Sequence, residues 1–435
     1  MAHARLTQVQ LDRFKSYRSA VMALDRLTIV TGRNSSGKSN ILDAIEVLAR
    51  LSGGESLAQA LDGAGRERSP VRGGSRGCAP FGEDSFALGC LIDMGEGRVL
   101  DYKIEVEVEP ILRIRRESLI ERGTRERQWF EVRHEQPGGL QVAYANGKRG
   151  KNPMVTVRDD RSVLGQLKTA LIADTKTTQD LIGRAATVSA VLANTFHLDP
   201  VPQLMRDYVS PRESRLRRNG ENLAAAVMDL QSRDPARFGR LQDIVRKVAD
   251  CDVHALDFSR TDEGLIMLAL DEGRSRKTTA RLMSDGLLRF IAVATALMTA
   301  STSLEVGEPD AIGLQGQGPI PGVVLAIEEI ENGLHPSHAA RLLEIVKEAA
   351  NQVGVSVLLT THSPALLDCL TGDLLGSVVV CHAGRISRMQ ELPGYAAAMA
   401  GGTLGRVVSK GELVSDEETP EADYSEFLRL IGVDA

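Results

Sequence analysis

Aromatic residues are scarce in this sequence, at 4% of 435 positions, and no apolar run is long. So few aromatic side chains argue against nucleic-acid binding by base stacking. The longest mostly apolar stretch, 290–300, is well short of the roughly 18 residues that suggest a membrane span. The N-terminal residues contain no apolar signal-peptide segment. We therefore expect a cytoplasmic protein that is not associated with a membrane.

The cysteines and the net charge give no sign of a disulfide framework, a zinc site or general binding to nucleic acid. The five cysteines are scattered, odd in number and never in CxxC spacing: Cys78, Cys90, Cys251, Cys369 and Cys381. This pattern argues for a reducing compartment and against a disulfide framework or a zinc site. The formal charge of −6 gives no global attraction to nucleic acid, so any contact with DNA requires a local basic surface.

The chain is long enough for two or three sub-structures, and its composition is that of a globular protein. Strands are predicted at 6–11, near Val21 and at 27–32, a helix at 39–51, alternating strands from 85 to 157, helices from 160 to 250 and strands at 253–270. The remainder alternates between helix and buried strand, which is typical of a partly parallel α/β sheet. We predict a lobe at 1–156, a helical insertion at 157–252 and a second lobe at 253–435.

A phosphate-binding loop is the most specific motif. The strand LTIVT leads directly into GRNSSGKS at 32–39 and then into a helix, as G-x-x-x-x-G-K-[ST] requires. Gly32 and Gly37 permit the tight turn, Lys38 provides charge to the β- and γ-phosphates, and the hydroxyl of Ser39 is the expected Mg²⁺ ligand. The alternative is a glycine-rich turn with a chance lysine. The residues predicted to contact ATP here are Gly32, Arg33, Asn34, Ser35, Ser36, Gly37, Lys38, Ser39 and Asn40.

Two carboxylates end the apolar strand in PGVVLAIEEIENGLHP, residues 321–336. A buried parallel strand would deliver Glu328 and Glu329 beside the phosphate loop. We predict that Glu328 orients Mg²⁺ and that Glu329 is the general base for the attacking water. A solvated acidic turn is the alternative. A transition-metal cluster with His335 and His338 is disfavoured because HExxH-type spacing is absent.

A third buried strand, in VSVLLTTHSPALL, ends at His362. In this position a histidine can hydrogen-bond the γ-phosphate or the attacking water. A lone histidine after a strand is more often structural, but the two other motifs favour a catalytic role.

The order of P-loop, SDGLLRF, IEEIENGLHP and LLTTHSP resembles the ABC ATPases of the SMC/RecF group. The resemblance is closest to compact RecF-like (AAA_21-type) bacterial ATPases of DNA repair or anti-phage defence. It implies a P-loop NTPase fold with an ABC ATPase head, an antiparallel β subdomain and a helical insertion. It also implies a homodimer or higher homo-oligomer in which a signature segment of one subunit caps the ATP of the other.

Two segments compete for the signature. LSGGES at 51–56 has the usual ABC letters, but it follows the P-loop helix directly, and we interpret it as a coincidence. The segment that matches in order is LMSDGLLRF, in which Ser284, Asp285 and Gly286 open an apolar helix. The alternative is an ordinary helix cap.

The same resemblance assigns the remaining motifs. Glu328 takes the place of the usual magnesium-associated aspartate and Glu329 that of the catalytic glutamate. Residues 331–335 match the D-loop, which crosses the dimer interface, and His362 matches the switch histidine. The longer side chain of Glu328, and His335 in place of an aspartate, depart from the family pattern, and no residue is assigned to the Q-loop.

Three basic clusters are candidates for DNA contact. They comprise Arg113, Arg115 and Arg116; Lys148, Arg149 and Lys151; and Arg212, Arg215, Arg217 and Arg218. Each could contact phosphates, although a charge run is usually a solvated face. The Arg212–Arg218 cluster is preferred, because it occupies the insertion that varies most with function in such ATPases.

The leading hypothesis is an ATP hydrolase that closes and opens as a dimer and controls DNA or a separately encoded effector. A nucleotide-dependent scaffold or sensor with little turnover is the second hypothesis. A transporter cassette is disfavoured by the β-rich lobe, the SDG signature and ENGLHP. We expect no intrinsic nuclease of the OLD type, because the 73 residues after His362 are too few for a complete Toprim domain.

Overall fold

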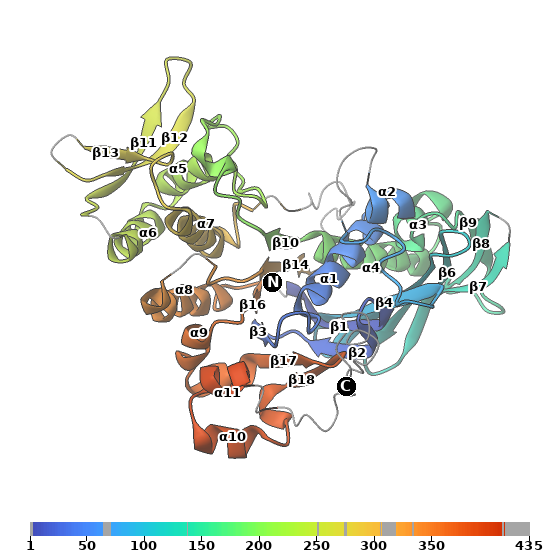
Figure 1. Ribbon diagram of the computed structural model, residues 1–435. Helices are drawn as coiled ribbons and strands as arrows, with labels where there is room; N and C mark the ends of the chain where they lie inside the picture. Colours follow the sequence, from blue (N-terminus) through green and yellow to red (C-terminus); the bar gives the residue numbers. More distant parts are fainter. Residues whose placement is uncertain are drawn as a thin grey trace, which may run out of the picture.

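The computed structural model describes residues 3–63, 71–136, 138–249, 252–273, 276–304, 306, 319–332, 335–410 and 413. Two lobes flank a central sheet (Figure 1). The sequence-based expectation of a mixed α/β fold with an antiparallel β subdomain is confirmed.

A six-stranded sheet in the described part of the chain forms the centre, with the order β10-β15-β16-β3-β17-β18. Its strands are β10 (Thr195–Leu198), β15 (Val323–Ile327), β16 (Val355–Thr360), β3 (Leu27–Thr31), β17 (Val378–His382) and β18 (Arg385–Arg388). All neighbours are parallel except β17 and β18. The carboxyl ends of β3, β10, β15 and β16 therefore meet at one edge, where open parallel sheets bind ligands.

Both faces of this sheet are buried, because successive side chains of a strand point to opposite faces. In β3, Ile29 joins one hydrophobic core and Val30 the other. In β16, Leu359 and Leu358 divide in the same way. Near-continuous apolar strands follow from this double burial. The sheet is the wall that both cores share, and it holds the site residues in place from both sides.

One lobe is built on a long, mainly antiparallel sheet with the order β14-β1-β4-β5-β6-β7-β8-β9, in which β14 is parallel to β1 and β2 also pairs with β1. The strands are β1 (His3–Phe14), β2 (Tyr17–Ala23), β4 (Ser85–Gly95), β5 (Arg98–Glu107), β6 (Arg113–Arg122), β7 (Arg127–Gln136), β8 (Gly139–Tyr144), β9 (Met154–Val157) and β14 (Ile320–Pro321). The helices of this lobe are α1 (Lys38–Ser52), α2 (Leu57–Asp62), α3 (Val163–Ala170) and α4 (Lys176–Ala193). Helix α1 packs against α4, β1 and β10, which fixes the phosphate loop relative to both sheets.

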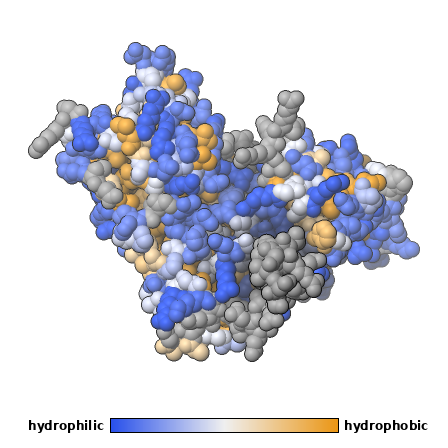
Figure 2. Space-filling view, in the orientation of Figure 1, coloured by the Kyte–Doolittle hydropathy of each residue, from blue (hydrophilic) through white to orange (hydrophobic). Residues whose placement is uncertain are grey.

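The other lobe joins a small antiparallel sheet to helices (Figure 1). The sheet contains β11 (Ala255–Arg260), β12 (Ile266–Asp271) and β13 (Lys277–Thr279). The helices are α5 (Leu223–Arg233), α6 (Pro235–Val248), α7 (Asp285–Thr299) and α8 (Ala339–Ala350), and α9 (Pro364–Asp368), α10 (Tyr395–Gly401) and α11 (Leu404–Lys410) follow along the chain. Figure 2 shows apolar residues gathered over the lobe that carries α5–α7, on an otherwise mostly hydrophilic face.

The range 157–252 contains more than the expected helices. It includes β10, which pairs with β15 in the central sheet and places His197 opposite Ala326. A strand of four residues, TFHL, is too short to show periodicity, so the sequence pattern missed it. The sequence pattern also missed the short helix α2, which follows α1. None of the helices in the described ranges has both the length and the apolarity needed to cross a bilayer.

Candidate nucleotide-binding site

The phosphate loop has the conformation that its glycines permit. Gly32 has φ +149° and Gly37 has φ +101°, in the region that L side chains rarely adopt. A Cβ atom on Gly32 would lie 2.4 Å from the carbonyl oxygen of Cys381 on β17. One on Gly37 would lie 2.6 Å from Tyr17 Oη. Both glycines are therefore required by sterics, and the chain between them curls around Lys38.

Lys38 is the cation at the bottom of this loop. Its Nζ atom donates to the carbonyl oxygens of Gly32, at 2.9 Å, and Arg33, at 3.0 Å. Burial lowers the pKa of Lys38, while the nearby carboxylates oppose this shift. Lys38 forms no ion pair within 4.0 Å among the described residues. A buried ammonium without a paired anion favours a ligand with negative charge.

A cavity of about 450 Å³ lies over the loop and is lined by Asn34–Asn40, Glu328, Glu329 and Thr360. It brings the predicted P-loop residues and both predicted carboxylates together. The buried Ser36 Oγ atom in the loop has no hydrogen-bond partner. Three features of this cavity fit the triphosphate of ATP: the unpaired hydroxyl of Ser36, the ammonium of Lys38, and the space beside Gly32 and Gly37 that a Cβ atom would fill.

Ser39 and Glu328, the two predicted magnesium ligands, line the same cavity. The hydroxyl of Ser39 hydrogen-bonds Glu328 Oε1, so α1 and the end of β15 are in direct contact. A hydroxyl and a carboxylate are hard oxygen donors of the kind that Mg²⁺ takes beside phosphates. The side chain of Glu328 therefore reaches Ser39, the other predicted magnesium ligand.

Glu329 is held in an unusual backbone conformation, with φ +47°. Its amide donates to Thr360 Oγ1 at 2.9 Å, which ties the end of β15 to the end of β16. His362 Nδ1 lies 3.7 Å from Glu329 Oε1. The structure thus brings the predicted base and the predicted switch histidine together, and a strained residue at this edge is typical of a functional position.

Ser284 does not line this cavity. It is the N-cap of α7, where its side chain accepts a hydrogen bond from the amide of Leu287. With Gly286 it lines a separate depression of about 600 Å³ that also includes His335 and His338. Asp285 lies outside that lining and pairs with Arg206 at 2.6 Å. Within one chain the P-loop and the predicted signature therefore belong to different cavities.

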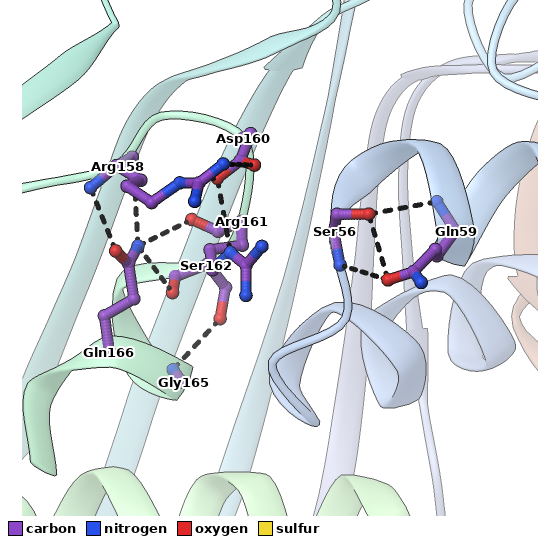
Figure 3. A network of polar contacts seen from close by, with 8 residues as sticks. All are labelled: Ser56, Gln59, Arg158, Asp160, Arg161, Ser162, Gly165 and Gln166. Carbon is purple, nitrogen blue, oxygen red and sulfur yellow. Dashed lines mark hydrogen bonds and ion pairs between the residues drawn. The ribbon is translucent and has the colours of Figure 1, made fainter. Parts of the chain in front are cut away.

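The segment 51–56, which matches the ABC signature only in its letters, has a structural role. It runs from the last residues of α1 to the N-cap of α2, where Ser56 forms a capping box with Gln59 (Figure 3). The neighbouring turn, in which Ser162 caps α3 through Gly165, is built on the same principle (Figure 3). The hydroxyl of Ser56 is occupied by this local cap.

Two residues near Glu328 were not identified from the sequence. Arg72 Nη1 lies 3.8 Å from Glu328 Oε1, and its guanidinium also pairs with Asp43 at 3.3 Å. His197 Nε2 lies 3.9 Å from Glu328 Oε2 and has no hydrogen-bond partner. Burial, and secondarily the charge of Arg218, lowers the pKa of His197. No local motif marked these residues, because separate segments bring them to Glu328.

The basic clusters are largely engaged within the molecule. Arg113, Arg115 and Arg116 pair with carboxylates of β5, and Arg115 also pairs with Asp84 at 3.0 Å. Lys148 pairs with Asp174 at 3.0 Å.

In the preferred cluster, Arg217 pairs with Glu213 and Glu221. Arg218 pairs with Glu46 on α1 through two bonds of 2.8 and 2.7 Å. Arg212 is exposed. These pairs reduce the positive charge that the clusters can present to phosphates.

The two histidines of the disfavoured metal cluster lie away from the nucleotide cavity. His335 and His338 lie at either end of a short turn, with ring centroids 6.0 Å apart. No group of three or more His, Cys, Asp or Glu side chains suited to a metal ion occurs among the described residues. Gly333 and Leu334 of the D-loop and Cys251 lie outside the described residues.

The chain was compared with solved structures, with curated proteins and with family models. Similar solved structures include an SMC head bound to the C-winged helix domain of ScpA, with 14% identity, 88% of this chain and 97% of that chain covered, and a TM-score of 0.46. The SMC head domain from Thermotoga maritima has 14% identity, 88% and 97% coverage and a TM-score of 0.39. An SMC head with an extended coiled coil, bound to the C-terminal domain of ScpA derived from Pyrococcus furiosus, has 13% identity, 88% and 95% coverage and a TM-score of 0.43. Such distant likenesses say nothing about ligands or partners.

No significant match to this sequence is found among curated proteins. The family model AAA_21, described as "AAA domain, putative AbiEii toxin, Type IV TA system", matches residues 27–135 and 184–368. These two ranges cover more than half of the chain and include the P-loop, both carboxylates and His362. The chain therefore belongs to the AAA_21 family, which is described as an AAA domain.

Proposed function

We propose that the chain hydrolyses ATP as a homodimer, with each nucleotide bound between the P-loop of one subunit and Ser284 of the other. The separation of the two cavities carries this proposal: Ser284 and Gly286 line one, and the P-loop with Glu328 and Glu329 lines the other. Ser284 opens a helix of 15 residues, whose N-terminus is suited to a phosphate. A second copy is the natural source of that phosphate.

The residues in and beside the nucleotide cavity could each take a different role in hydrolysis. The ammonium of Lys38 and the loop amides would hold the β- and γ-phosphates. Ser39 and Glu328 would hold Mg²⁺, which neutralises charge on the phosphate oxygens. The carboxylate of Glu329 would accept the proton of the attacking water, and His362 would contact the water or the γ-phosphate.

The output of hydrolysis is proposed to be control of DNA or of a separately encoded effector, in DNA repair or anti-phage defence. The family description refers to the AbiEii toxin of a type IV toxin–antitoxin system, in keeping with a role in defence. If DNA is a partner, Arg212 is an exposed residue of the preferred cluster and a candidate for the contact.

Mixing two inactive variants tests the shared site. Lys38→Ala removes the P-loop cation, and Ser284→Arg blocks the helix N-terminus. Each variant alone should be inactive, whereas an equal mixture should regain activity, because one of the two sites in a mixed dimer combines an intact P-loop with an intact Ser284. No recovery, after subunit exchange has been demonstrated, would contradict a shared site. Tight ATP binding without turnover by the wild type would favour the scaffold instead.

A further inference from the structure

The loops that follow β15 and β16 are joined by a carboxylate that the proposed mechanism does not use. Glu331 Oε1 accepts hydrogen bonds from the amide of His362, at 2.9 Å, and from the amide of Ser363, at 3.0 Å. Its side chain is 15% exposed. An ionised acceptor that takes two backbone amides forms strong bonds. Glu331 therefore fixes the backbone that carries His362.

The same carboxylate also faces the imidazole ring. His362 Nδ1 lies 3.5 Å from Glu331 Oε1 and 3.7 Å from Glu329 Oε1. The ring edge with Nδ1 is thus turned toward two carboxylates. Nε2 has no hydrogen-bond partner among the described residues and is left for another ligand. In histidines that act on a ligand, the group bound to one ring nitrogen sets the role of the other.

The second carboxylate oxygen of Glu331 indicates that this residue does more than hold two loops together. Oε2 is buried and has no hydrogen-bond partner. A carboxylate oxygen buried without a donor costs stability, so a residue selected only for stability would have its acceptors satisfied. Residues that break this rule are typical of functional sites.

We infer that Glu331 is a positioning residue, which holds His362 so that Nδ1 faces the carboxylates and Nε2 faces the γ-phosphate or the attacking water. This inference rests on the proposed function, because it gives His362 its orientation for hydrolysis. Glu331 is not among the residues that line the nucleotide cavity, so we infer that it acts through His362.

The kinetic test compares Glu331→Ala, Glu331→Gln, His362→Ala and the double variant Glu331→Ala/His362→Ala. Glu331→Ala should lower kcat by about 10- to 100-fold, the usual effect of losing an orienting partner, and leave the KM for ATP nearly unchanged. Glu331→Gln keeps an oxygen that can accept from both amides, so it should recover most of the loss. The double variant should be no slower than His362→Ala alone, because both changes remove one function.

Hydrogen exchange gives a second readout that needs no turnover. In Glu331→Ala the amides of His362 and Ser363 should exchange faster than in the wild type, and in Glu331→Gln they should stay protected. If the wild type does not hydrolyse ATP, the proposed function fails, while this measurement still decides whether Glu331 holds the loop. Equal exchange in all three proteins would overturn the inference. So would a double variant in which the two kinetic losses multiply.

Discussion

Thr360 Oγ1 accepts a 2.9 Å hydrogen bond from the amide of Glu329, a residue with φ +47°. Left-handed backbone at a non-glycine residue costs of order 1–3 kcal/mol, so it persists only where the surroundings hold it. Thr360→Val removes the acceptor and keeps the shape. We predict a loss of about tenfold in kcat, equivalent to one hydrogen bond of about 1.4 kcal/mol.

Thr360→Ser is the matched control, since its hydroxyl can accept the same bond. It should retain most of the wild-type activity. ATPase assays with both variants, at equal nucleotide occupancy, make the comparison. Equal rates for the two variants would show that the bond to Glu329 does not contribute to catalysis.

The two central residues of the proposed mechanism should separate binding from chemistry. Lys38→Ala removes the ammonium group that would contact the β- and γ-phosphates, so tight ATP binding should be lost. Glu329→Gln keeps the size of the side chain and should bind ATP while losing roughly 10²–10⁴ in hydrolysis, the usual contribution of a general base. Equilibrium binding of a fluorescent ATP analogue, together with single-turnover hydrolysis, distinguishes the two effects. Wild-type turnover by Glu329→Gln would refute this assignment.

Local sequence patterns were sufficient for the parts of the site that are continuous in the chain. The strand–loop–helix setting around Lys38 and the strand ending at Glu329 are readable because each motif is one element with its own periodicity. Arg72 and His197 could not be found in this way. Both reach Glu328 only because separate segments meet at one edge of the sheet, and β10 is too short to show a pattern.

Backbone sterics at Gly32 provide a test with an internal control. Gly32→Ala would place Cβ 2.4 Å from a backbone oxygen of β17, which cannot move aside as a side chain can. Gly82 has φ +83° and nothing within 4 Å of its Cβ position. Gly82→Ala should therefore show only the left-handed penalty of about 1–2 kcal/mol, whereas Gly32→Ala should also abolish ATP binding. ATP binding by Gly32→Ala at wild-type affinity would contradict this account of the loop.

Glu117 should make stability depend on pH. It is buried on β6 and accepts hydrogen bonds from the amides of Val163 and Leu164 and from Tyr102 Oη. Burial raises the pKa of Glu117 from 4.5 to about 7, against the effect of these bonds. Because the folded-state pKa is the higher one, the stabilisation is fully present below about pH 4.5 and is lost as the pH rises through about 7, a difference of about 3 kcal/mol.

Thermal unfolding between about pH 5 and about pH 8.5 measures this effect. The wild type should lose stability across the window. Glu117→Gln cannot ionise, so its pH dependence should be smaller, whatever its absolute stability. Glu96→Gln, at an exposed turn, is the control and should follow the wild type. A pH dependence unchanged in Glu117→Gln would refute the role of this carboxyl.

Arg218 and Arg212 belong to the same predicted DNA-binding cluster but have different surroundings. Arg218 forms two bonds to Glu46, at 2.8 and 2.7 Å, and a third to the carbonyl of His197, at 3.1 Å. Arg218→Ala should therefore destabilise the protein by about 2 kcal/mol, because Glu46 is mostly buried and would lose a charged partner.

Arg212 is exposed, so Arg212→Ala should leave the unfolding midpoint unchanged. If this cluster contacts DNA, Arg212→Ala should also reduce the salt dependence of binding by about one phosphate contact. Thermal unfolding and salt titrations of DNA binding measure both effects. Arg218 is already paired with Glu46, so Arg218→Ala should lower stability and leave DNA affinity unchanged. If this variant instead loses DNA affinity and keeps its stability, the pair with Glu46 must open to let Arg218 contact the phosphates.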